Sequence, residues 1–163
     1  MRTLTRRELL AIAGGIAVGW LPGTPRADAA VKWIDRQNYG PFHCAATFPL
    51  AELDPALREL AVLESERHRT RGLPGGKAPI DVLLFNSQAQ HREFLSRRFP
   101  RVPYRRALFV QTGERGAVYA YRHAELPVDL RHECTHALLH ANLAMVPLWL
   151  DEGLAEYFEM PPG

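Results

Sequence analysis

Apolar positions recur along the chain with two different periods, and these periods divide it into strands and helices. Alternation at every second position, or a short continuous apolar run, is typical of a strand, whereas apolar residues three and four positions apart indicate a helix. By this criterion strands are expected at residues 41–50, 80–85, 107–111 and 117–122. The sequence TGERG at residues 112–116 separates the last two strands and predicts a hairpin.

Helices are predicted between and after these strands. Asp54-Pro55 places a capping residue before a proline, which is well tolerated in a first helical turn. The expected helices cover residues 54–69, 86–99, 127–142 and 147–158, and residues 31–40 are expected to form an extended or irregular arm. The order β-α-β-α-β-β-α-α predicts an α+β fold, with helices packed on a small, mostly antiparallel or mixed sheet.

The first 29 residues differ from the rest in composition. The arginine pair Arg6-Arg7 precedes an apolar segment at residues 9–21, and Ala27-Asp28-Ala29 offers an A-x-A cleavage site. The segment TRRELL resembles a twin-arginine export signal, with an ordinary secretory leader or an uncleaved anchor as alternatives. We therefore expect residues 1–29 to be an export signal peptide. Residues 30–163 are expected to form one exported domain, periplasmic or secreted, in the bacterial cell envelope.

Composition and charge narrow the classes of function. Of 163 residues, 47% are hydrophobic and 23% charged, as in ordinary globular domains, and two cysteines are too few for a disulfide scaffold. The formal charge of +2 belongs to the leader, because residues 30–163 carry sixteen basic and sixteen acidic side chains. A neutral domain lacks the electrostatic footprint of nucleic-acid binding. No segment after the leader is apolar enough to predict a stable membrane span once the signal is cleaved.

The main chemical signal is the sequence HECTH at residues 132–136, a match to the HExxH metal-binding motif. Residues 128–146 contain neither glycine nor proline, so the motif is expected to lie on a helix. His132 and His136 are then four positions apart on one face, and both imidazoles can bind one Zn²⁺. Glu133 lies beside that ion, where it suits a general base acting on metal-activated water.

A catalytic zinc needs a third protein ligand, for which the best candidate is Glu152 in the sequence WLDEGLAEY. From His136 the first helix climbs about 9 Å to residue 142, and a returning helix from residue 147 climbs about 7.5 Å to Glu152. Because the two rises nearly cancel, Glu152 returns to the level of His136. The sequence therefore predicts a helical hairpin with His132, His136 and Glu152 facing inward.

The stretches HECTHALLH and PLWLDEGLAEYFE resemble those of gluzincin zinc metallopeptidases, most of all the peptidase MA-like bacterial members. The resemblance covers residues 129–159 and implies a zincin-like N-terminal half whose HExxH helix forms the active site. It implies that His132, His136 and Glu152 bind zinc, that Glu133 is the catalytic base, and that peptides or proteins are the substrates. Two alternatives are a zincin-fold binding or structural protein that keeps zinc with little turnover, and a zinc hydrolase acting on a non-peptide bond.

Residues around the motif have alternative interpretations. Glu156, one turn beyond Glu152, is either a partner for the outer nitrogen of a ligating histidine or a solvated carboxylate. Asp151 is a weaker candidate for the same partnership, and His140 is interpreted as a packed residue bordering the site. Trp149 and Leu150 are expected to pack the second helix onto the first.

Tyr119 and Tyr121 alternate on the strand before the motif helix. In gluzincins the corresponding edge strand binds an extended substrate backbone, and a hairpin strand with aromatic packing is an equally good interpretation. Cys44 and Cys134 are interpreted as buried thiols, a disulfide being the less favoured outcome of export.

Many gluzincins continue into a further helical half that closes the cleft and stabilises the oxyanion. No counterpart to that half is found before Gly163, so this domain is expected to lack it. The alternatives are a minimal protein, completion by another chain, or a piece of a longer protein.

Overall fold

The computed structural model describes residues 16–17, 31–71, 79–143 and 145–159. The predicted export signal lies outside these ranges except for Ile16 and Ala17. Within the described ranges, no helix is both long and apolar enough to span a bilayer.

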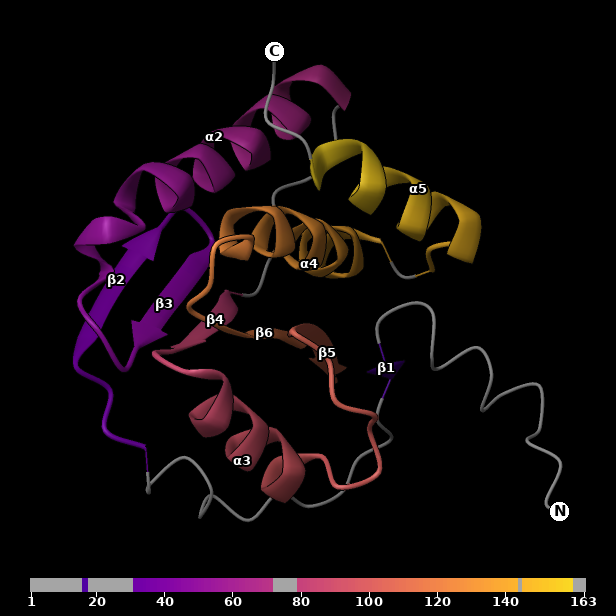
Figure 1. Ribbon diagram of the computed structural model, residues 1–163. Coiled ribbons are helices and arrows are strands. Elements are labelled where there is room, and N and C mark those ends of the chain that lie inside the picture. Colours follow the sequence, from indigo (N-terminus) through magenta and orange to yellow (C-terminus); the bar gives the residue numbers. More distant parts are fainter. Residues whose placement is uncertain (1–15, 18–30, 72–78, 144, 160–163) are drawn as a thin grey trace, which may run out of the picture.

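A mixed β-sheet runs through the centre of the molecule (Figure 1). Its strands are β2 (Asp35–Tyr39), β3 (Phe42–Ala46), β4 (Ile80–Phe85), β5 (Ala107–Thr112) and β6 (Arg115–Tyr121). They are arranged in the order β5-β6-β4-β3-β2, and the two-residue strand β1 (Ile16–Ala17) lies parallel to β5. β2–β3 and β5–β6 are antiparallel pairs, whereas β4 runs parallel to both β3 and β6. The prediction of an α+β fold is confirmed, with a mixed sheet.

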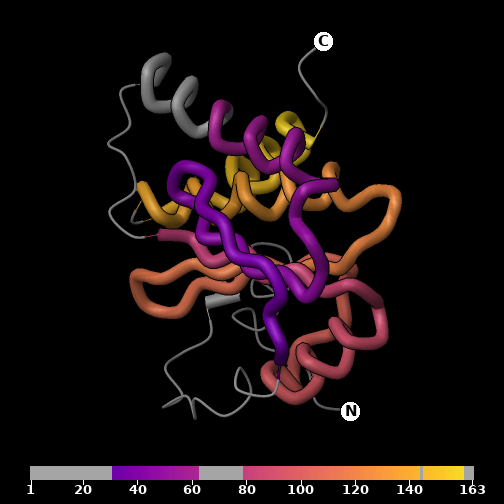
Figure 2. The backbone as a smooth tube through the Cα atoms, turned by 90° about the vertical axis from the view of Figure 1, so that its left-hand side faces the viewer, coloured from indigo at the N-terminus to yellow at the C-terminus, as the bar shows by residue number. Residues whose placement is uncertain are grey.

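Helices cover both faces of this sheet (Figure 1, Figure 2). One side carries α2 (Asp54–Arg71), α4 (Leu126–Asn142) and α5 (Leu148–Glu159), preceded by the short 3-10 helix η2 (Leu50–Glu52). The other side carries α3 (Gln88–Arg98). α4 packs directly on β5 and β6, and α5 packs on α4. The four expected helices are all present, with ends that differ by one or two residues from those predicted.

Alternate residues of the central strands pack into two separate apolar cores, one on each face of the sheet. Along β4, Val82 and Leu84 belong to the core that contains Leu57 of α2 and Leu130 of α4. Phe85 points the other way, into an aromatic core beneath α3. This alternation is the expected consequence of a strand whose successive side chains point to opposite faces. The sheet therefore separates an aliphatic layer under α4 from an aromatic layer under α3.

The expectation of an extended or irregular arm at residues 31–40 is confirmed in its extended form, because β2 occupies half of this range. β2 reads DRQNY, and only Tyr39 at its end is buried. It pairs with β3 through a tight turn at Gly40, whose φ of 56° favours glycine. A polar edge strand is held by main-chain hydrogen bonds, so it leaves no hydrophobic period in the sequence.

The edge-strand interpretation of Tyr119 and Tyr121 is also wrong, because β6 lies between β5 and β4. The Tyr119 ring is 5.7 Å from that of Phe94 and 5.4 Å from that of Phe99, measured between centroids. The alternative, a hairpin strand with aromatic packing, is confirmed.

Candidate metal centre

The rotation of α4 is set by the apolar face that it buries. Leu130, Cys134, Ala137 and Leu138 are at most 5% exposed and pack into the aliphatic core. These positions follow the four- and three-residue spacing of one helical face. The motif histidines lie on a different face, which α5 covers. Burial of the apolar face therefore turns His132 and His136 toward α5.

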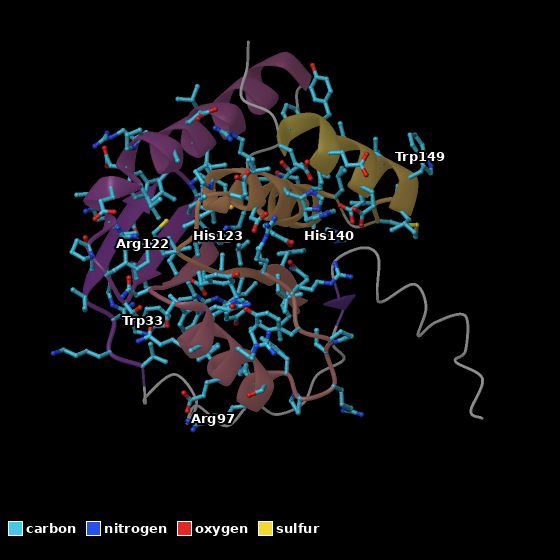
Figure 3. All side chains as sticks on the ribbon, viewed as in Figure 1. Trp33, Arg97, Arg122, His123, His140 and Trp149 are labelled. Atoms are coloured by element: carbon cyan, nitrogen blue, oxygen red, sulfur yellow. The ribbon has the colours of Figure 1, made fainter. Side chains whose placement is uncertain are left out.

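α5 is oriented by small and acidic residues rather than by its tryptophan. Asp151 is 2% exposed and Ala155 is fully buried, one turn apart on the face that meets α4. Trp149 is 76% exposed and projects outward from α5 (Figure 3). The expectation that Trp149 packs the two helices together is therefore wrong. The small Ala155 allows close approach, and Asp151 is the buried polar contact.

The two helices bring together the three predicted ligands. The Nε2 atoms of His132 and His136 are 3.1 Å apart. The Glu152 Oε2 atom lies 3.9 Å from each of these nitrogens. A zinc ion about 2.0–2.1 Å from each ligand in tetrahedral geometry would hold its ligand atoms about 3.3 Å apart. The three donor atoms therefore fit zinc with only small adjustments.

Both ring nitrogens that face away from this cluster are held by carboxylates of α5. His132 Nδ1 donates to Glu159 Oε1 at 2.7 Å, and His136 Nδ1 donates to Asp151 Oδ1 at 2.7 Å. The other Asp151 oxygen, Oδ2, is 3.0 Å from His140 Nε2. Carboxylates in this position orient a ligating imidazole and make it a better donor.

These contacts decide between the alternatives for the acidic residues. Asp151, the weaker candidate, is the partner of His136. Glu156 is exposed, which agrees with the solvated interpretation. Glu159 was not predicted as a partner of His132. Its sequence position could have suggested it, because Glu159 is seven residues from Glu152 and so returns to the same face after two turns.

The charges around the site shift two pKa values in opposite directions. Burial lowers the pKa of His136, but its hydrogen bond to Asp151 and the charge of that carboxylate outweigh burial, so this pKa is raised. Burial would raise the pKa of Asp151, but the hydrogen bonds with His136 and His140 hold it well below its usual range. The pair is thus a polarised imidazole beside a firmly ionised carboxylate.

Glu133 lies beside the cluster of His132, His136 and Glu152 but is not one of its three candidate ligands. Its Oε2 accepts the backbone N–H of Phe109, in β5, at 2.7 Å. Burial raises the pKa of Glu133, and this effect exceeds the opposing charges of His136 and His132 and the Phe109 hydrogen bond. The carboxylate is therefore oriented by β5 and is easier to protonate than an ordinary glutamate.

A hollow of about 220 Å³ opens beside this carboxylate. Its lining residues are Arg106, Ala107, Asp129, His132, Glu133 and Glu159. A small group placed there would be next to both a motif histidine and the candidate base.

The cysteines lie away from this hollow, in the aliphatic core. Cys44 and Cys134 are both unpaired thiols, 3% and 0% exposed. Burial raises the pKa of Cys44 to about 12 and that of Cys134 well above its usual value. The interpretation of both as buried thiols is confirmed.

Comparison with known proteins identifies no family for this chain. Neither protein-family models nor curated proteins match the chain. The resemblance to gluzincins therefore remains a prediction from the sequence.

Proposed function

We propose that this chain is a zinc-dependent metallopeptidase of the gluzincin type. His132, His136 and Glu152 are its zinc ligands, and Glu133 is its general base. A zincin-like arrangement, with the HExxH sequence on α4 and the third ligand on α5, is part of the proposal. The observation that carries it is the convergence of two imidazole nitrogens, 3.1 Å apart, on a carboxylate oxygen 3.9 Å from each.

The hydrogen-bonding pattern favours a metal over a simple network of polar side chains. Glu159 and Asp151 occupy the Nδ1 sides of His132 and His136, so both Nδ1 atoms carry hydrogens. In the neutral rings the Nε2 atoms then present lone pairs to each other. Two lone pairs at 3.1 Å repel unless a positive charge, either a proton carried by one ring or a metal ion, lies between them. Zn²⁺ meets that requirement for both rings and for Glu152 at once.

The residues around the cluster suit peptide hydrolysis. A bound zinc ion would polarise the scissile carbonyl and lower the pKa of a water molecule. Glu133, held by the Phe109 N–H, removes a proton from the attacking water and later returns it to the leaving amine. The adjacent hollow admits part of the substrate.

The exported location is proposed on the sequence alone. The predicted signal at residues 1–29 would carry the domain out of the cytoplasm, where peptides or proteins of the cell envelope or surroundings are the substrates.

The test uses the purified full chain and Glu133→Gln. We expect one zinc per chain by elemental analysis, cleavage of a peptide library, and loss of cleavage with a chelator. Glu133→Gln should keep the zinc and lower kcat by about 100- to 10,000-fold, the usual contribution of a general base. Glu156→Gln is the matched control, because it removes an exposed carboxylate of α5. A chain that binds no zinc, or a Glu133→Gln variant as active as wild type, would overturn the proposal.

A further inference from the structure

The hollow beside Glu133 contains one arginine among its lining residues, Arg106. Arg106 directly precedes β5, the strand whose Phe109 N–H holds the candidate base. Its position therefore depends on the same strand that orients Glu133.

The Arg106 side chain is anchored rather than free to move over the surface. Its Nη2 donates to Asp129 Oδ1 at 2.8 Å, and the Asp129 side chain is only 12% exposed. The other Asp129 oxygen lies 3.1 Å from His123 Nε2. Asp129 is on α4, one turn before His132. The ion pair therefore anchors the guanidinium to the helix that carries the HExxH motif. The Arg106 side chain stays 53% exposed and lines the hollow, so a solute can reach it.

The other charged residues of the hollow already have partners. Glu133 accepts from the Phe109 backbone, and Glu159 accepts from His132. Asp129 uses one of the five N–H donors of a guanidinium. The remaining donors form a planar fork that matches a carboxylate better than any neutral group.

We propose that Arg106 binds a carboxylate of the substrate in this hollow, so that the enzyme prefers peptides with a negative charge beside the scissile bond. The proposal rests on the proposed peptidase function. The hollow, of about 220 Å³, is large enough to admit a small polar group such as a carboxylate. The carboxylate could come from the C-terminus of a peptide or from an aspartate or glutamate side chain.

Paired peptides separate these two sources. One pair differs only in a free or amidated C-terminus, and another only in Asp or Asn after the cleaved bond. Charge-assisted hydrogen bonds suggest a preference of about 10- to 100-fold in kcat/KM for the charged member of at least one pair. The pair that shows the preference identifies the source. A wild-type enzyme that cleaves both members of both pairs equally would overturn the proposal.

Variants then assign the preference to Arg106. Arg106→Ala should raise KM for the charged peptides by about 10- to 100-fold and change the neutral peptides by less than about twofold. Arg106→Lys should recover part of the preference, because it keeps the charge without the planar fork. Arg101→Ala is the control, an exposed arginine of the same connection that does not line the hollow. Equal losses on charged and neutral peptides would show a structural role and overturn the proposal.

Binding to an inactive form distinguishes failure of this inference from failure of the peptidase function. Zinc-loaded Glu133→Gln can be titrated with the same peptides by calorimetry, with and without Arg106→Ala. A charged-over-neutral preference in Kd that disappears with Arg106→Ala supports the carboxylate site even if the wild type cleaves nothing. Equal Kd values for charged and neutral peptides contradict it, whatever the activity.

Discussion

Two buried histidines on opposite sides of the sheet have opposite chemical characters. His91, on α3, is fully buried among the rings of Phe85, Tyr104 and Tyr121, with centroids 5.4–5.6 Å away. Burial lowers its pKa to about 4. His136, on α4, is 4% exposed, but its hydrogen bond to Asp151 raises its pKa despite burial.

The comparison shows that burial does not make a histidine a functional group. In the aromatic layer the imidazole is neutral and packs like another ring. Between α4 and α5 a carboxylate on one nitrogen polarises the ring and directs the other nitrogen toward His132 and Glu152. The difference comes from the second helix, because Asp151 and Glu152 are adjacent residues of α5.

Removing one histidine from each region should have the largest effect. His136→Ala should weaken zinc binding by about 100- to 1,000-fold, since structural zinc sites gain about 10–16 kcal/mol from four ligands, or about 2.5–4 kcal/mol per ligand. His91→Phe should leave zinc affinity unchanged. Competition with a chromophoric chelator measures both values. A His136→Ala variant that binds zinc as tightly as wild type would show that His136 differs from His91 in burial contacts alone and not in zinc binding.

The free energy of unfolding should fall in acid because the folded protein keeps His91 neutral. Its pKa is about 4 when folded and about 6.5 when unfolded, so below pH 6.5 the unfolded chain binds a proton that the folded chain excludes. Stability should therefore be lost as the pH falls from about 6.5 to about 4, by roughly 3 kcal/mol.

Urea unfolding of wild type and His91→Phe at pH 7 and pH 4 isolates this contribution, because acid effects at the other histidines cancel in the difference. The variant should lose less stability than wild type. Equal losses would mean that His91 is already protonated in the folded protein.

Neutralising the carboxylates that hold the ligands should have a smaller effect than removing a ligand. Asp151→Asn and Glu159→Gln should each lower zinc affinity by about 10- to 100-fold, the usual effect of losing an orienting partner. Glu156→Gln, which alters an exposed carboxylate of the same helix, should change it little. If all three variants bind zinc alike, the contacts to Nδ1 do not orient the rings.

The smallest effect is expected at Trp149. Because its side chain is 76% exposed, Trp149→Ser should change the free energy of unfolding by less than about 0.5 kcal/mol. Leu130→Ala, in the fully buried face of α4, should cost about 2–5 kcal/mol. A large loss of stability from Trp149→Ser would mean that the tryptophan packs against α4 after all.

The local pattern of the sequence was sufficient to predict the helices and the convergence of His132, His136 and Glu152. A spacing of four places His132 and His136 on one face of any helix, and the length of the hairpin returns Glu152 to their level. These relations are short in sequence and depend only on helix geometry. For this reason the convergence of these three residues could be predicted before any packing was known.

Only the tertiary structure decided which carboxylates face the histidines, which strand lies at the edge, and that Arg106 borders the hollow. A hydrophobic period records which face of an element is buried, but not the angle at which two helices cross or the order in which strands pair. The rotation of α5 over α4 selected Asp151 and Glu159 over Glu156. The strand order placed β6 inside the sheet and β2 at its edge. Because β2 is mostly polar, its sequence shows no hydrophobic period. Such arrangements depend on packing between residues far apart in the chain, which no local pattern records.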